Sequence, residues 1–244
     1  MSLNPEDEAQ LRLQQLLADG ELAIVSAGFR CFTKIELSKQ LGIDQESLTF
    51  DSGFFPPAAV ARMLESDVID LSKGHTACIK TEDFDSAAHG RGIRFERSSY
   101  ADIDRLATGP KMPGINQYLD STFGYYTLSE NDGYVLAHYN WHKFGAGKGG
   151  RIHNVAKNIS AIGDLLTKRL NRLKQKCDRA TSVLMVVGET QGYRYMMVDD
   201  EAHSLLDNSP IAEAGRHVFG AKCQMVTLSD VATATDALRI LRHS

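Results

Sequence analysis

Apolar and polar residues along the chain repeat first with a helical period and then with a strand period. The segment "PEDEAQLRLQQLLADG" begins acidic, carries leucines at helical spacing and ends at Gly20, which predicts a capped amphipathic helix. The short apolar run "ELAIVSAG" predicts a strand, and residues 31–41 predict a second helix that ends at Gly42. The apolar positions of that second helix are Phe32, Ile35, Leu37 and Leu41.

The middle of the chain gives weaker signals. The segment "SLTFDSGFFPPAAVARMLES" predicts a β-like stretch, a turn and a helix that starts near Pro57. Residues 70–117 are rich in Gly, Asp, Ser and Arg, and only the runs "TACIK" and "GIRFE" indicate strands, so we expect an irregular insertion there. The run "DGYVLAHYNW" then predicts a buried strand that ends near His138.

The last third of the chain returns to clear periods. Residues 154–177 predict a long helix with a basic end, and "SVLMVVG" predicts a strand that is apolar on both faces, as in the centre of an α/β sheet. Beyond it we expect a strand in "YRYMMVDD", a helix around "EAHSLL", a strand in "CQMVTL" and a final helix opened by Ser229. This alternation predicts one α/β domain over residues 1–244, with a layered, mostly parallel sheet flanked by helices.

Composition narrows the class of protein. Apolar residues make up 43% of the chain and charged residues 24%, which is typical of a globular domain, and the net charge of −4 gives no nucleic-acid footprint. The acidic start lacks the features of a signal peptide, and no run of apolar residues is long enough to span a bilayer, so we expect no membrane partner. The four cysteines have no paired spacing, which favours reduced thiols and a cytoplasmic location.

Cys31 is the first candidate for chemistry. It lies where the predicted strand turns into a helix, and the positive end of a helix dipole favours a thiolate over a thiol. Arg30 and Lys34 would add positive potential, an imidazole could accept the proton, and backbone N–H groups could hold an oxyanion. The alternative is that Cys31 is a small packing residue, since free cysteine is among the most buried residue types.

His138 is the candidate base, because it ends an apolar strand at an edge where sites form. His142 and His153 follow it, but their spacing matches no established metal site, so we expect neither a metal nor a cofactor. Asp51, in "TFDSGFF", could orient the histidine or hold a substrate, or it could cap the turn before Pro56.

A glycine-rich loop, "GAGKGGR", is the candidate for anion binding. It fails the phosphate-loop pattern, because His142 stands where a glycine is required and Gly149 follows Lys148. Lys148, Arg151 and the start of the long helix could still hold an anion, with Arg30 as a further cation, or the loop could be solvated. The run "VGETQGYR" lacks a full dinucleotide fingerprint.

The order of these segments resembles a bacterial domain family described as papain-like cysteine peptidases, whose activity is itself a prediction. The resemblance runs from Ile24 to Val187 and is carried by "VSAGFRC", "LTFDSGFFPPAAVARMLES", "GYVLAHYNW" and the long basic helix before "SVLMVV". It implies Cys31 as nucleophile, His138 as base, and Phe50 and Asp51 as the Phe-Asp pair of the family.

The chain departs from that family at several positions. Thr49 and Ser52 replace the Pro and Trp that flank Phe-Asp, and Tyr139 replaces the Asp that follows the histidine. The arginine pair expected early in the long helix is absent, with Lys157, Asn158 and Ile159 near that place. The resemblance also implies an α+β papain-like fold as the alternative to a parallel sheet.

Three functions follow from these observations. The first is a cysteine-dependent hydrolase or acyltransferase acting on a peptide or small molecule through Cys31, His138 and Asp51. The second is a non-catalytic module that binds an anion such as a sugar phosphate or nucleotide. The third, suggested only by the resemblance, is a structural domain accessory to a bacterial surface-polysaccharide system.

Overall fold

Strands from the first and last thirds of the chain form a three-stranded parallel sheet. The computed structural model describes residues 4–71, 75–87, 90–99, 126–129, 133–137 and 155–242. The sheet has the order β1 (Leu22–Ser26), β7 (Ser182–Val187), β10 (Cys223–Thr227). Its register pairs Ser26 with Val186 and Thr227 with Val187, so the three strands end at one edge. The segments that follow the strands therefore meet at that edge.

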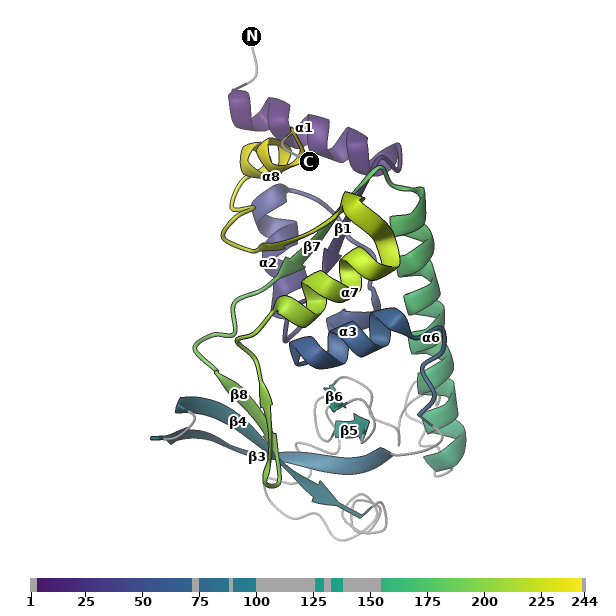
Figure 1. Cartoon of the computed structure of the whole chain (residues 1–244), viewed down its shortest axis with the longest axis vertical. Helices are drawn as coiled ribbons and strands as arrows, with labels where there is room; N and C mark the ends of the chain where they lie inside the picture. Colours follow the sequence, from purple (N-terminus) through teal and green to yellow (C-terminus); the bar gives the residue numbers. More distant parts are fainter. Residues whose placement is uncertain are drawn as a thin grey trace, which may run out of the picture.

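Both faces of this sheet are covered, as the continuous apolar runs predict. Side chains alternate along a strand, so Ala23 and Val25 lie in one core while Leu22 and Ile24 lie in another. The first core contains residues of α3 (Pro57–Glu65), α6 (Val155–Arg179) and α7 (Ser209–Phe219). The second contains residues of α1 (Pro5–Ala18), α2 (Phe32–Leu41) and α8 (Ala234–Arg242). Figure 1 shows α1 and α8 side by side at one end of the molecule.

A carboxylate of α1 holds the start of α8. Glu6 accepts hydrogen bonds from the backbone N–H of Ala234 and from the Thr235 hydroxyl, each at 2.7 Å. The first N–H groups of a helix have no partner inside it, and a negative charge is favoured at that end. Glu6 thus caps a helix that lies at the other end of the chain.

Replacing Glu6 with alanine is expected to lower the free energy of unfolding by about 1 kcal/mol, because the N-terminus of α8 loses its distant cap. Urea unfolding followed by circular dichroism measures the loss. Glu8→Ala is the matched control, since Glu8 lies in the same acidic first turn of α1 but is exposed. Equal losses in the two variants would show that Glu6 acts only through the dipole of its own helix.

A second sheet of seven strands lies at the opposite end of the molecule from α1 (Figure 1). Its order is β2 (Gly53–Phe54), β6 (Tyr134–Leu136), β5 (Tyr126–Ser129), β3 (His75–Ser86), β4 (Gly90–Ser98), β8 (Tyr195–Val198), β9 (Glu201–Ser204). Among the described residues only β4 and β8 pair in parallel; the other pairings of this sheet are antiparallel. The α/β class is therefore confirmed, but a mostly parallel sheet describes only β1, β7 and β10.

Three element predictions need correction. In the segment expected to be irregular, the strands indicated at "TACIK" and "GIRFE" extend into the long antiparallel pair β3 and β4, with one register shift between Lys80 and Glu82, and residues 100–117 lie outside the described residues. The first four residues of the run "EAHSLL", Glu201–Ser204, form β9 rather than a helix, since a turn at Asp199 with φ 49° folds them back on β8. The last helix starts at Ala234 rather than Ser229, because the Thr233 hydroxyl accepts the N–H of Asp236.

Helix lengths bear on membrane association. The 25-residue α6 carries most of its basic residues in its second half, from Lys168 to Arg179. Within the part of the chain that the structure describes, no helix is both long and apolar enough to cross a bilayer.

Candidate functional site

Cys31 occupies the N-cap position of α2, just beyond the carboxyl end of β1. Its thiol is half-buried, whereas Cys78, Cys177 and Cys223 are buried, and all four thiols are free. Burial raises the pKa of Cys177 to about 12 and the pKa of Cys223 to about 11, and it also raises the pKa of Cys78. Cys31 is thus the cysteine best placed to react with a molecule from solvent.

The rotation of α2 is set by a close contact beneath it. Thr33 is buried, and its side chain fits against two glycines, Gly28 after β1 and Gly188 after β7. A Cβ at either glycine would overlap the Thr33 hydroxyl. With Thr33 turned inward, Phe32 and Ile35 are each 45% exposed, so of the apolar positions that predicted this helix only Leu37 and Leu41 are buried.

Asp51 lies in the 3-10 turn η1 (Thr49–Ser52), between α2 and the short strand β2. Its carboxylate accepts the Ser26 hydroxyl at 2.5 Å and the Leu48 N–H at 2.7 Å, and the Lys34 ammonium lies at 3.7 Å. The bond to Leu48 closes the turn, and the bond to Ser26 ties that turn to the end of β1. Asp51 therefore holds the segment before β2 against the strand that leads to Cys31.

The electrostatics of Asp51 are dominated by burial. Desolvation raises the pKa of its carboxyl above 3.8, although hydrogen bonds from Ser26 and Leu48 and the charges of Lys34 and Arg169 act in the opposite direction. Asp51 is only 8% exposed, and its carboxylate accepts hydrogen bonds from the Ser26 hydroxyl and the Leu48 N–H. An ionised group in this position adds negative potential near the start of α2.

Backbone contacts connect the Cys31 segment to the strand before His138. The N–H of Phe55 donates to the carbonyl of Phe29 at 3.1 Å, which joins the β1–α2 loop to β2. β2 in turn pairs with β6, with Gly53 opposite Leu136. Phe29 and Ala137 lie in the same hydrophobic core. The structure thus brings together the loop of Cys31, the turn of Asp51 and the last described residue before His138.

Several predicted site residues lie outside the described residues. These are His138, the base candidate, and Lys148 and Arg151, the anion-binding candidates. His142 and His153, considered for metal binding, also lie outside them. Within residues 4–71, 75–87, 90–99, 126–129, 133–137 and 155–242, no group of three or more His, Cys, Asp or Glu side chains could hold a metal ion.

Arg30 is packed among aromatic rings. Its guanidinium carbon lies 4.9 Å from the centroid of Phe54 and 5.7 Å from that of Tyr193, and its Nη1 donates to Oε1 of Gln191 at 3.2 Å. A second guanidinium lies over the same ring: the guanidinium carbon of Arg91 is 4.6 Å from the centroid of Tyr193. Sequence reasoning found Arg30 but missed Arg91, Gln191 and Tyr193, because they come from distant segments without a shared motif.

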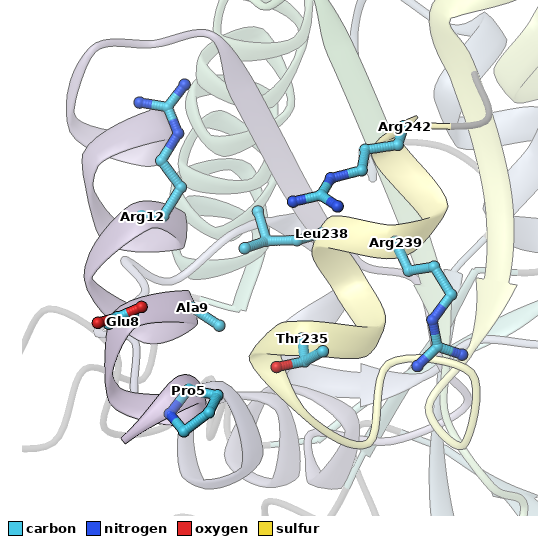
Figure 2. Close-up of a pocket in the computed structure, with 8 residues that line it drawn as sticks. All are labelled: Pro5, Glu8, Ala9, Arg12, Thr235, Leu238, Arg239 and Arg242. Carbon is cyan, nitrogen blue, oxygen red and sulfur yellow. The ribbon is translucent and has the colours of Figure 1, made fainter. Parts of the chain in front are cut away.

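The described residues enclose a small cavity near Cys31 and line a larger groove farther away. The space between the carboxyl ends of β1 and β7, lined by Gly28, Phe29, Phe55 and Gly188, has a volume of about 10 Å³, which is room for about one water. A groove between α1 and α8 is larger, about 440 Å³, but it holds no thiol or histidine. Figure 2 shows that Arg12 and Arg239 point away from each other there, whereas the Arg242 side chain extends toward Leu238.

Comparisons of the chain with models of protein families, with curated proteins and with solved structures find no match. Any functional assignment therefore depends on the residues themselves.

Proposed function

We propose that the protein is a cysteine-dependent hydrolase or acyltransferase with Cys31 as its nucleophile and His138 as its base. The observation that carries the proposal is the meeting of three segments: the half-exposed thiol at the start of α2, the Asp51 turn bonded to β1, and β6 leading to His138. The resemblance to papain-like cysteine peptidases supports the same pair of residues, and the α+β papain-like arrangement stays a prediction.

The reaction would proceed in two steps. The Cys31 sulfur attacks the substrate carbonyl carbon after its proton passes to His138, and a tetrahedral oxyanion forms. The Thr33 N–H already donates to the Arg30 carbonyl at 3.3 Å, so the other backbone N–H groups at the start of α2 would stabilise that oxyanion. His138 then protonates the leaving group, a thioester remains on Cys31, and water or another acceptor attacks it while His138 takes the proton back.

Asp51 has a positioning role in this proposal. Its two oxygens are already engaged by Ser26 and Leu48, so it fixes the turn and supplies a nearby negative charge. Lys34, one helical turn after Cys31, lies between the thiol's helix and this carboxylate. The free state of all four thiols supports a reducing compartment, and we therefore propose the cytoplasm.

Iodoacetamide labelling followed by peptide mass spectrometry tests the nucleophile. At pH 7 we expect Cys31 to label at least about tenfold faster than the other three cysteines, because those are buried and their pKa values are raised. His138→Ala is expected to slow labelling at Cys31 and to leave the other sites unchanged, since only Cys31 would lose its proton acceptor.

A chromogenic acetyl ester tests the chemistry on protein that has not been treated with iodoacetamide. The parent protein is expected to form an acetyl adduct on Cys31 with a burst of released alcohol, and Cys31→Ser is expected to lose the burst. Cys177→Ser is the matched control, because that thiol is buried. A thiol–imidazole pair would be ruled out if Cys31 is labelled no faster than Cys177, or if His138→Ala leaves the labelling rate of Cys31 unchanged.

A further inference from the structure

Two guanidiniums share one aromatic ring beside Cys31. Both Arg30, the residue before Cys31, and Arg91, on β4, lie over Tyr193, at 5.7 and 4.6 Å from its centroid. Their guanidinium carbons are therefore at most about 10 Å apart. Like charges this close repel each other, and the repulsion is strongest where water is partly excluded.

The turn after β7 fixes both side chains. Gln191 has φ 56° and Gly192 has φ 82°, which turns the chain sharply between β7 and Tyr193. In this turn Oε1 of Gln191 accepts from Arg30 and the carbonyl of Gln191 accepts from Arg91, each at 3.2 Å. The two guanidiniums are thus held in place by stacking and by one residue, before any ligand binds.

Neither guanidinium has a carboxylate partner within the described residues. Other arginines of the seven-stranded sheet do: Arg94 pairs with Glu82 at 3.3 Å, and Arg97 pairs with Asp199 at 3.0 Å.

Two acids, Asp83 and Asp85, lie on the neighbouring strand β3. The carboxylate of Asp83 accepts the Tyr193 hydroxyl at 2.9 Å, at the polar end of the ring. Asp85 stands opposite Arg91 in the register of β3 and β4 and is exposed, without an ion pair to it. Each guanidinium has five N–H donors and gives one to Gln191, so several donors on each are open to a ligand.

We propose that Arg30 and Arg91 form a subsite for a phosphate-type dianion, so that the substrate of the Cys31 site carries a phosphate group. A dianion balances both charges, and its tetrahedral oxygens can accept from two guanidiniums at once. A single carboxylate is satisfied by one guanidinium fork, so it would use only half of the pair. The link to the substrate rests on the proposed function, whereas anion binding at the pair does not.

Phosphate binding to the Cys31→Ser protein, measured by isothermal titration calorimetry at constant ionic strength, tests the subsite. This variant has no nucleophile, so a failure of the thiol chemistry cannot change the readout, and the labelling experiment above contains no phosphate. In the Cys31→Ser background, Arg91→Gln and Arg30→Gln are each expected to weaken inorganic phosphate binding at least about tenfold. Arg91 is exposed, so Arg91→Gln keeps the test valid even if Arg30→Gln unfolds the aromatic cluster.

Arg12→Gln is the matched control, because Arg12 is an exposed guanidinium in the α1–α8 groove, far along the chain from Tyr193. It is expected to leave phosphate binding unchanged. A second series replaces phosphate with acetate, which has a single carboxylate and is expected to bind at least about tenfold more weakly. The proposal is overturned if phosphate does not bind, if Arg91→Gln binds it as the parent does, if Arg12→Gln weakens it equally, or if acetate binds as tightly.

Discussion

Replacing Gly28 with alanine is expected to lower the free energy of unfolding by about 3 kcal/mol, at the upper end of the cost of overpacking a core. The new Cβ would lie 1.8 Å from the Thr33 hydroxyl oxygen and 2.8 Å from the Thr33 Cβ. The second of these atoms is fixed to the backbone of α2, so a change of rotamer cannot remove the clash. The helix that carries Cys31 would have to shift away from the sheet. Chemical denaturation followed by circular dichroism measures the loss.

A compensating substitution tests this explanation. Thr33→Ala removes the hydroxyl and methyl groups but keeps the Cβ, so Gly28→Ala/Thr33→Ala is expected to recover about half of the lost stability, with a coupling of at least about 1 kcal/mol. The Cβ of Gly188→Ala would lie 2.0 Å from the same hydroxyl, so this variant is expected to lose a similar amount of stability and to recover part of it with Thr33→Ala.

Gly220→Ala separates the clash from backbone effects. Gly220 has φ 78° and open space around its would-be Cβ, so its replacement is expected to cost about 1 kcal/mol from conformation alone. Gly28 has no such positive φ. A loss for Gly28→Ala no greater than that for Gly220→Ala would show that α2 can move without cost. The position of Cys31 would then not be fixed by the glycine pair.

The sequence predicts the parallel sheet well, because its signal is local. The runs "ELAIV" and "SVLMVV" are apolar on both faces, and each strand does place alternate residues in two cores. The hairpin of β8 and β9 is missed for a different reason: a short polar segment such as "EAHS" has no strand period, and its pairing depends on the backbone at Asp199. Local pattern therefore identifies strands that are buried on both faces better than exposed edge strands.

The face of α2 illustrates a second limit. Hydrophobicity alone turns Phe32 and Ile35 inward, whereas the structure turns Thr33 inward. The difference arises from Gly28 and Gly188, which allow a closer approach than any residue with a side chain. These glycines belong to two loops that meet only in the folded chain, so no helical period could have indicated their effect.

The candidate site is predictable in its parts but not in its contacts. Cys31 at a helix start follows from the order of strand, glycine turn and helix, and the structure places it there. The partner of Asp51 is Ser26, 25 residues away, and the partner of Arg30 is Gln191, 161 residues away. Which polar groups meet depends on strand order and register, and these depend on the packing of the whole chain.

Replacing Asp51 with alanine is expected to lower the free energy of unfolding by about 3 kcal/mol, because the buried N–H of Leu48 and the hydroxyl of Ser26 lose their acceptor. Asp51→Asn is the matched control. Its amide oxygen can accept from Leu48 while its amide N–H donates to the Ser26 oxygen, so the expected loss is below about 1 kcal/mol. Urea titration at pH 7 compares the two. Similar losses in both variants would show that charge, rather than hydrogen bonding, holds the turn.

The pH dependence of stability in the parent protein and in Asp51→Asn tests the environment of Asp51. Burial raises the pKa of this carboxyl in the folded state above its unfolded value of 3.8, so the folded protein binds a proton before the unfolded chain does. As the pH falls from 7 through the folded pKa, the parent should therefore gain stability relative to Asp51→Asn. The gain should be complete once the pH falls below the unfolded value. A relative loss over the same range would mean that Lys34 and the two hydrogen bonds outweigh desolvation. The carboxylate would then be a stabilising ion at the start of α2 rather than a buried charge held there at a cost.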